Sequence, residues 1–286
     1  MSRRFRLALP SKGRLHEPAL DLVRAAGFEL EGNGRALYAH CSQWDVEVLF
    51  ARAEDMPAWA VDGAVEAAVA GRDQVAEGGG ALAELVALGF GRCSLQVAVP
   101  SGAAVASLAD LDGRRVATSH PRVTADFFAG RGLRVETVAV RGSVELAPRL
   151  DAAEAICDLV QSGETLRQNG LLPIATVLES EALLVARPDL EPAQQRVADE
   201  LATVVRSVID ARNRRYLMLN APDASLEQIV ALLPGLDSPT VLPLAKPGWH
   251  SVHAVVEQRQ VMELLEPLRA AGARSLLVLP IHHLIA

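Results

Sequence analysis

The stretch from Glu154 to Leu171 combines carboxylates, hydroxyls and glycines at spacings that suit a sugar phosphate. A turn in its middle precedes the start of a predicted short helix, whose unpaired N–H groups and positive dipole end attract anions. Gly163 lets the backbone approach a phosphate, and Ser162 and Thr165 add hydroxyl donors. Asp158 lies just before the turn, where a carboxylate repels phosphate but accepts hydrogen bonds from sugar hydroxyls. The stretch therefore suits a ribose 5-phosphate.

The elements that must position these groups are a strand, a turn and a helix. Ala155 to Val160 is an apolar run interrupted only by Asp158, which predicts a buried strand of an α/β sheet. Asn169 and Gly170 tolerate a positive φ and are expected to end the helix. An ordinary capped turn explains this pattern as well, because such units are common. The stretch is not a Walker A loop, since it has no Gly-x-x-x-x-Gly-Lys.

Charged residues also follow other predicted strands. Phe5 to Leu9 predicts a first strand, and Lys12 and Arg14 lie in the loop after it. Open α/β sheets bind ligands at the carboxyl ends of their strands, so both side chains are candidates for phosphate contacts. A solvated charge pair is the alternative. Three further charged residues lie just past predicted strands: Arg52, Arg72 and Asp73.

A further acidic residue lies at the predicted start of a helix. Gly142 to Glu145 predicts this start, with Ser143 as the N-cap. Glu145 then falls in the first turn, where a carboxylate also compensates the helix dipole.

Composition limits the class of protein. A chain of 286 residues suffices for about two domains. The net charge of −7 argues against a nucleic-acid partner, so anionic substrates must be met by local Arg and Lys. Three widely spaced cysteines indicate buried free thiols in a reducing compartment. No secretory h-region and no apolar run of about 18 residues is visible, so we expect a soluble cytoplasmic protein.

The last part of the chain has a different pattern. Glu191 to Arg215 predicts a long amphipathic helix, with arginines crowding its C-terminal end. Residues 216–286 then predict the order βαββαβ, with Ser225 capping the first helix, which is typical of a ferredoxin-like module. His250 and His253 fall on opposite faces of a predicted strand, so no fixed metal site is expected.

Two segments resemble the ATP phosphoribosyltransferase family, which opens histidine biosynthesis. The string from 154 to 171 follows the family signature: an acid, Ala-Ile, one variable residue, Asp-Leu-Val, two variable residues, Gly, one variable residue, Thr-Leu, two variable residues, Asn and Gly-Leu. Glu154 stands where the family usually has Asp. Gly142 to Pro148 has the family's Gly-Ser-Val-Glu-Leu-Ala-Pro unchanged. The resemblance covers nearly the whole chain and includes the regulatory domain of the long form.

The resemblance implies a two-lobe catalytic part of the periplasmic-binding-protein type II fold, followed by an ACT-type domain. Lobe I is expected at residues 1–95 and 180–215, and lobe II, with the phosphoribosyl loop, at 96–179. Residues 216–286 would form the ferredoxin-like regulatory domain, and the ligand cleft would lie between the lobes.

The reaction implied is the transfer of a phosphoribosyl group from phosphoribosyl pyrophosphate to N-1 of ATP, which releases pyrophosphate and uses Mg²⁺ bound to the substrate. The loop expected to hold the 5-phosphate comprises Ser162, Gly163, Glu164, Thr165 and Leu166. The acids expected at the ribose hydroxyls are Glu145, Asp158 and Glu154. The residues expected at pyrophosphate or at the nucleotide are Lys12, Arg14, Arg52, Arg72 and Asp73. No residue is nominated as a general base.

The resemblance also implies a homo-oligomer, a dimer or hexamer, that is inhibited by histidine. Asn220, Ser238 and Thr240 are the expected contacts to histidine, the last two within the string Pro234 to Thr240. Ser-Pro-Thr is also ordinary turn chemistry. Two other classes of protein remain open: a non-enzymatic binding protein on the same two-lobe fold, and an amino-acid sensor based on the last ~70 residues.

Overall fold

A computed structural model describes residues 4–30, 37–41, 43–105, 107–233, 235–236 and 238–285. The chain divides into two compact units, residues 1–202 and 203–286, and the division falls within helix α6 (Pro192–Arg212). The domain bounds expected from the sequence therefore stay a prediction.

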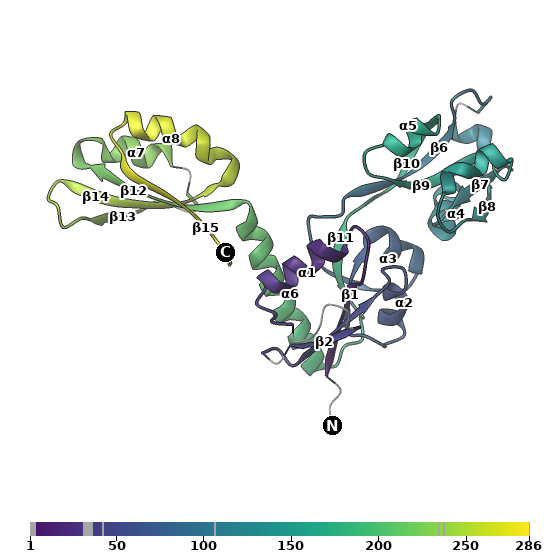
Figure 1. Cartoon of the computed structure of the whole chain (residues 1–286), viewed down its shortest axis with the longest axis horizontal. Helices are drawn as coiled ribbons and strands as arrows, with labels where there is room; N and C mark the ends of the chain where they lie inside the picture. The colour runs from purple at the N-terminus through teal and green to yellow at the C-terminus, as the bar shows by residue number, and fades with distance from the viewer. Residues whose placement is uncertain are drawn as a thin grey trace. The chain divides into compact units, whose positions relative to one another are not determined.

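A six-stranded mixed sheet forms the part of the first unit that we term lobe I, with strand order β2-β3-β1-β4-β11-β5 (Figure 1). Its strands are β1 (Phe5–Pro10), β2 (Tyr38–Cys41), β3 (Val46–Ala51), β4 (Ala67–Gly71), β5 (Ala83–Ala87) and β11 (Ala182–Ala186). Its helices are α1 (His16–Ala25), α2 (Met56–Val61) and α3 (Arg72–Gly78). Every residue of β4 and β11 is buried, as expected for short apolar strands in the middle of a covered sheet.

A five-stranded sheet with the order β10-β6-β9-β7-β8 forms lobe II (Figure 1). Its strands are β6 (Cys93–Pro100), β7 (Arg115–Thr118), β8 (Glu136–Ala139), β9 (Ala155–Val160) and β10 (Leu171–Ser180). Its helices are η1 (Leu108–Leu111), α4 (Pro121–Ala129), η2 (Val144–Leu150) and α5 (Glu164–Gln168). Strands β7, β8 and β9 run parallel, so the segments that follow β7 and β9 leave the sheet at one edge.

The chain crosses between the two sheets twice, from β5 to β6 and from β10 to β11. The two crossings meet where Cys93 at the start of β6 pairs with Ser180 at the end of β10. Two α/β sheets joined by two crossing segments are the expected periplasmic-binding-protein type II arrangement, which is confirmed.

The second unit contains an antiparallel sheet with the order β13-β14-β12-β15. Its strands are β12 (Arg214–Pro222), β13 (Thr240–Pro243), β14 (Trp249–Glu257) and β15 (Arg274–Pro280). Its helices are η3 (Asp223–Ser225), α7 (Leu226–Leu232), η4 (Gln258–Gln260) and α8 (Val261–Ala270). Alternate residues of β12 and β14 pack with α7 and α8 in one core. The predicted βαββαβ module is confirmed.

Three local predictions were wrong. Helix α6 ends at Arg212, and Arg214 and Arg215 instead begin β12. Ser143 has a left-handed φ of 48° and does not cap a helix; the segment after it is a 3-10 helix. Pro148 inside that segment has no N–H to donate, which disfavours a regular α-helix. Ser225 makes no cap hydrogen bond, because the 3-10 turn η3 already leads into α7.

Cys41, Cys93 and Cys157 are buried and free, as predicted. Burial raises the pKa of the Cys157 thiol to about 12. None of the helices in the described residues has both the length and the apolar character of a membrane span.

Candidate active site

A cleft of about 380 Å³ in the first unit contains most of the acids and hydroxyls singled out in the sequence. Lobe I contributes Arg14, and lobe II contributes Glu145 and the segment from the end of β9 to α5. The lining residues of that segment are Asp158, Leu159, Val160, Gln161, Ser162, Gly163, Thr165 and Leu166. The cleft therefore brings together two carboxylates, two hydroxyls, a glycine turn and one arginine.

The turn between β9 and α5 is shaped for close approach of a ligand. Gly163 has a left-handed φ of 74°, which strains any residue with a Cβ atom. The backbone N–H of Glu164 points back to Ser162 Oγ at 3.4 Å. Leu166 is buried in a cluster with Ile156 of β9, so the turn rests on a packed core. Of the two residues expected to end α5, only Gly170 adopts a positive φ; Asn169 has a φ of −93°.

Asp158 is the carboxylate whose environment is most perturbed in this cleft. Burial raises its pKa above the ordinary range, and the negative charge of Glu145 raises it further. The Leu159 N–H, His120 and the Ser119 hydroxyl act in the opposite direction, but they do not cancel the rise. Two carboxylates near each other in one cleft need donors between them, and sugar hydroxyls are suitable donors.

A second cleft, of about 240 Å³, shares Arg14 with the first. Its lining residues are Lys12, Gly13, Arg14, Leu15, Arg52, Ala53, Glu54 and Gln74. Three cations face this space against one carboxylate, which suits a polyanionic ligand. Lys12 and Arg52 therefore line a cleft whose positive charge suits the phosphate contacts expected for them. Arg14 lines both clefts.

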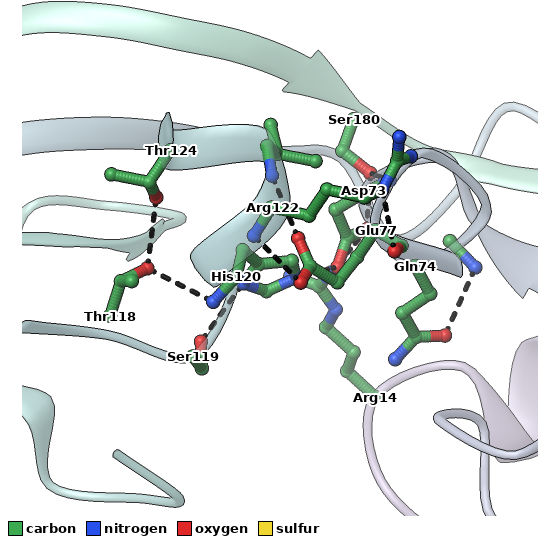
Figure 2. A network of polar contacts seen from close by, with 12 residues as sticks. Arg14, Asp73, Gln74, Glu77, Thr118, Ser119, His120, Arg122, Thr124 and Ser180 are labelled. Atoms are coloured by element: carbon green, nitrogen blue, oxygen red, sulfur yellow. Dashed lines mark hydrogen bonds and ion pairs between the residues drawn. The ribbon is translucent and has the colours of Figure 1, made fainter. Parts of the chain in front are cut away.

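Asp73 is in contact with other side chains of the protein and has no exposed surface, so the ligand contact expected for it is not available in this structure. Ser180 Oγ donates to Asp73 Oδ1 at 2.5 Å, and His120 Nε2 lies 3.2 Å from Oδ2. Arg14 Nη2 is 3.8 Å from Oδ1. Figure 2 shows these groups converging on Asp73. Burial raises its pKa, but the bonds from His120 and Ser180 and the Arg14 charge outweigh burial and lower it.

Three other expected residues lie outside both clefts. Glu154 precedes β9, about 13 Å along the strand from Asp158, where the cleft lining begins, and it pairs with Arg115 at 2.9 Å, which lowers the pKa of Glu154. Glu164 is exposed and accepts from Arg167 at 2.6 Å, a bond that lowers the pKa of Glu164. Arg72 contacts Glu84 at 3.3 Å and Glu181 at 3.7 Å. The sequence could not show these pairings, because most of the partners are distant along the chain.

Sequence reasoning missed several site residues. Gln161 and Gln74 line the clefts, and Ser119 and His120 are close enough to Asp158 to lower the pKa of that carboxyl. The signal for His120 was present, because it is the second residue after β7, whose carboxyl end shares an edge with that of the parallel β9.

Asn220 and Thr240 lie on the same face of the sheet in the second unit. Asn220 pairs with Ser251, and Thr240 pairs with His253, two positions further along β14. Both ring nitrogens of His253 are hydrogen-bonded: Nδ1 lies 2.7 Å from the Tyr216 hydroxyl, and Nε2 lies 2.8 Å from the Ser251 hydroxyl. Ser238 is exposed, and Pro234 and Asp237 of the same string are outside the described residues.

Comparisons with known proteins identify the family of the chain. Residues 52–207 match the family described as ATP phosphoribosyltransferase, and residues 211–283 match the one described as "HisG, C-terminal domain". The ATP phosphoribosyltransferase of Natronomonas pharaonis is 42% identical over 282 residues, covering 98% of this chain and all of that protein. The one from Cytophaga hutchinsonii is 38% identical over 285 residues and covers both chains completely.

A solved structure entitled ATP phosphoribosyl transferase (HisG:HisZ) complex, from Thermotoga maritima, shares the fold of the first unit, with a TM-score of 0.64. It is 23% identical and covers 72% of this chain and 98% of that one. The family match over most of the chain, the full-length relatives and the additional C-terminal domain lead to one conclusion: this chain belongs to the ATP phosphoribosyltransferase family and is a long-form member of it.

Proposed function

We propose that the chain transfers the phosphoribosyl group of phosphoribosyl pyrophosphate to N-1 of ATP, with pyrophosphate as the leaving group. The observation that carries this proposal is the first cleft, where a glycine–hydroxyl turn and two carboxylates lie together opposite Arg14. Turnover of ATP, phosphoribosyl pyrophosphate and Mg²⁺ to a product with changed ultraviolet absorbance tests it. Absence of this product with folded protein would contradict the proposal.

Each part of the cleft has a proposed role. Ser162, Gly163 and Thr165 bind the 5-phosphate through hydroxyl and backbone donors. Glu145 and Asp158 accept hydrogen bonds from the ribose hydroxyls and orient the sugar ring. The reacting carbon gains positive charge while the leaving pyrophosphate gains negative charge. Arg14, next to the second cleft with its Lys12 and Arg52, stabilises that negative charge.

Thr165→Ala tests the phosphate loop. Its hydroxyl donates to a dianion, and charge-assisted hydrogen bonds contribute ~1.5–3 kcal/mol, so affinity for phosphoribosyl pyrophosphate should fall roughly tenfold to a hundredfold. Calorimetric titration measures this change. Glu164→Gln is the matched control, because the neighbouring Glu164 is exposed and bonded to Arg167; its affinity should stay within about twofold of the wild type. Equal affinities of Thr165→Ala and the control for phosphoribosyl pyrophosphate would show that Thr165 does not bind the phosphate.

Mg²⁺ is proposed to arrive with the substrate. Within the described residues no three His, Cys, Asp or Glu side chains form a metal-binding cluster, whereas pyrophosphate oxygens are ligands that Mg²⁺ prefers. We therefore expect EDTA to abolish turnover, while titration of the protein alone with Mg²⁺ gives no heat of tight binding. Micromolar Mg²⁺ binding without substrate would show that the protein has a site of its own.

We also propose that histidine binds the sheet face of the second unit that contains Asn220 and Thr240, and that this binding lowers the turnover rate. Coupling between such sites is typically worth ~1–3 kcal/mol, which predicts an inhibition of roughly fivefold or more at saturation. Asn220→Ala should weaken the inhibition without changing the uninhibited rate. Ser225→Ala is the control, since Ser225 lies near Gly272 beside the helices, away from that face. Full activity of the wild type in millimolar histidine would exclude this regulation.

A homo-oligomer is the proposed state of the chain. Edge strand β15 leaves Leu277 54% and Leu279 42% exposed, and both are large apolar residues on the edge of a sheet. Light scattering of the purified chain should give a mass that is a multiple of 30.4 kDa. A monomer at micromolar concentration would contradict the proposal.

A further inference from the structure

A chain of polar contacts centred on the buried Asp73 and His120 joins the two lobes. Asp73 on α3 of lobe I faces His120, which lies between β7 and α4 of lobe II, with 3.2 Å between Oδ2 and Nε2. The other ring nitrogen, Nδ1, lies 2.9 Å from the hydroxyl of Ser119. Figure 2 shows this sequence of contacts. Asp73 has no exposed surface and only 6% of His120 is exposed, so neither is placed to contact a ligand directly.

Both central groups are fixed by further bonds. Asp73 accepts from Ser180 Oγ, and the Asp73 N–H donates back to the same oxygen at 3.1 Å. The His120 N–H donates to Thr118 Oγ1 at 2.9 Å, and that hydroxyl lies 3.1 Å from Thr124 Oγ1. A buried carboxylate is tolerated only where its hydrogen-bonding capacity is used, and here it is used by groups from both lobes. The arrangement is therefore well defined.

Each end of the chain of contacts leads to a residue that lines the cleft. On the lobe I side, Asp73 lies 3.8 Å from the guanidinium of Arg14. On the lobe II side, the Ser119 hydroxyl is close enough to Asp158 to lower the pKa of that carboxyl against the effect of burial. Two buried residues thus connect a proposed leaving-group contact with a proposed ribose contact.

We propose that Asp73 and His120 are positioning residues that hold Arg14 of lobe I and Asp158 of lobe II in register across the cleft. The proposal rests on the proposed function, in which Asp158 contacts the ribose hydroxyls and Arg14 contacts the leaving pyrophosphate. A displacement of about 1 Å in such a site is enough to cost about a hundredfold in rate. Asp73 and His120 therefore affect the rate through Arg14 and Asp158 rather than through a ligand of their own.

A double-mutant cycle tests whether Asp73 acts through Arg14. Asp73→Asn alone should lower kcat about tenfold to a hundredfold, because the uncharged amide no longer fixes the guanidinium. In the Arg14→Ala background the same substitution should lower kcat by less than about threefold further. The loss should be larger in kcat than in the affinity for phosphoribosyl pyrophosphate, because the unchanged phosphate loop still holds the 5-phosphate of that substrate.

His120 has two informative replacements. A glutamine amide reaches the position of Nε2 and can still donate to Asp73, whereas alanine removes the side-chain contacts with both Asp73 and Ser119. His120→Gln should therefore retain at least about tenfold more kcat than His120→Ala when both are assayed at a temperature at which both are fully folded. Equal kcat values for the two variants would show that the contact with Asp73 has no role in positioning.

Glu77→Gln is the matched control, since Glu77 also joins the two lobes. Its carboxylate accepts from the N–H groups of Arg122 at 3.0 Å and Val123 at 2.9 Å, and Glu77 lines neither cleft. The fold-change in kcat caused by Glu77→Gln should be the same in the wild-type and Arg14→Ala backgrounds, because the two sites act independently. If the fold-change in kcat caused by Asp73→Asn is also the same in both backgrounds, the buried pair only holds the lobes together and the inference is wrong.

The same cycle can be measured without turnover. Calorimetric affinity for inorganic pyrophosphate should fall on Asp73→Asn in the wild-type background but not in the Arg14→Ala background. If the wild type binds pyrophosphate but forms no product, the proposed function is wrong. The binding cycle still tests the inference in that case, because it needs no turnover. Parallel losses of affinity in both backgrounds would overturn the inference even if the enzyme is active.

Discussion

Arg14→Ala is expected to lower kcat/KM by about 10²–10³-fold, the range found when one donor to a charge that develops in the transition state is removed. Arg14 lines both clefts, so it is placed to meet the pyrophosphate as it leaves the sugar. Its removal also takes a nearby cation away from the buried carboxylate of Asp73. Steady-state kinetics in saturating ATP and Mg²⁺ measure the effect.

Arg72→Ala is the control for that prediction. Both arginines follow strands of the same sheet, but Arg72 is engaged by Glu84 and Glu181 and lines neither cleft. Its replacement should change kcat/KM by less than about threefold, since partly exposed ion pairs contribute little. A loss in Arg72→Ala equal to that in Arg14→Ala would mean that the clefts do not define the site.

Asp158→Asn is expected to lower kcat by about a hundredfold and to change the pH profile. Burial and then the charge of Glu145 raise the pKa of Asp158, so its carboxyl takes up a proton at a higher pH than the ordinary value of about 3.9. The protonated form accepts ribose hydroxyl bonds poorly. Wild-type kcat/KM should therefore fall as the pH drops through this raised pKa, and it should be full above it.

The pH profile of Asp158→Asn should lack that acid limb, because asparagine does not titrate. Rates measured from pH 4.5 to 8 with a stability check at each pH separate titration from unfolding. The control is Asp126→Asn, an exposed residue of α4 that pairs with Arg122 outside the cleft; its acid limb should match the wild type. If the acid limb persists unchanged in Asp158→Asn, the group that titrates there is not Asp158.

Much of the fold could be predicted from short-range patterns. The strand Ala155–Val160 was predicted with both ends correct, because its apolar run is followed at once by the turn residues around Ser162 and Gly163. The module βαββαβ followed from the strand and helix patterns along residues 216–286 and from Gly272, which follows α8. Such signals are local, since the chain itself contains both the hydrophobic period and the residue that interrupts it.

The candidate site could be predicted only where its residues are neighbours in sequence. The segment from Asp158 to Leu166 is one such case, and all of its residues except Glu164 line one cleft. Asp73 contacts His120, 47 positions away along the chain, and Ser180, 107 positions away, so no local sequence pattern could predict these contacts. Glu154 was assigned to the site by resemblance, but the first half of β9 separates it from the cleft, and its carboxylate pairs with Arg115.

The stoichiometry of pyrophosphate release tests the central claim most directly. The protein is incubated with phosphoribosyl pyrophosphate and Mg²⁺, with and without ATP, and pyrophosphate and phosphoribosyl-ATP are quantified together. If the first cleft places the sugar for attack by adenine, pyrophosphate appears only when ATP is present, in a one-to-one ratio with phosphoribosyl-ATP, and Asp158→Asn slows both equally. Release of pyrophosphate without ATP, or equal rates in Asp158→Asn and the wild type, would contradict the account.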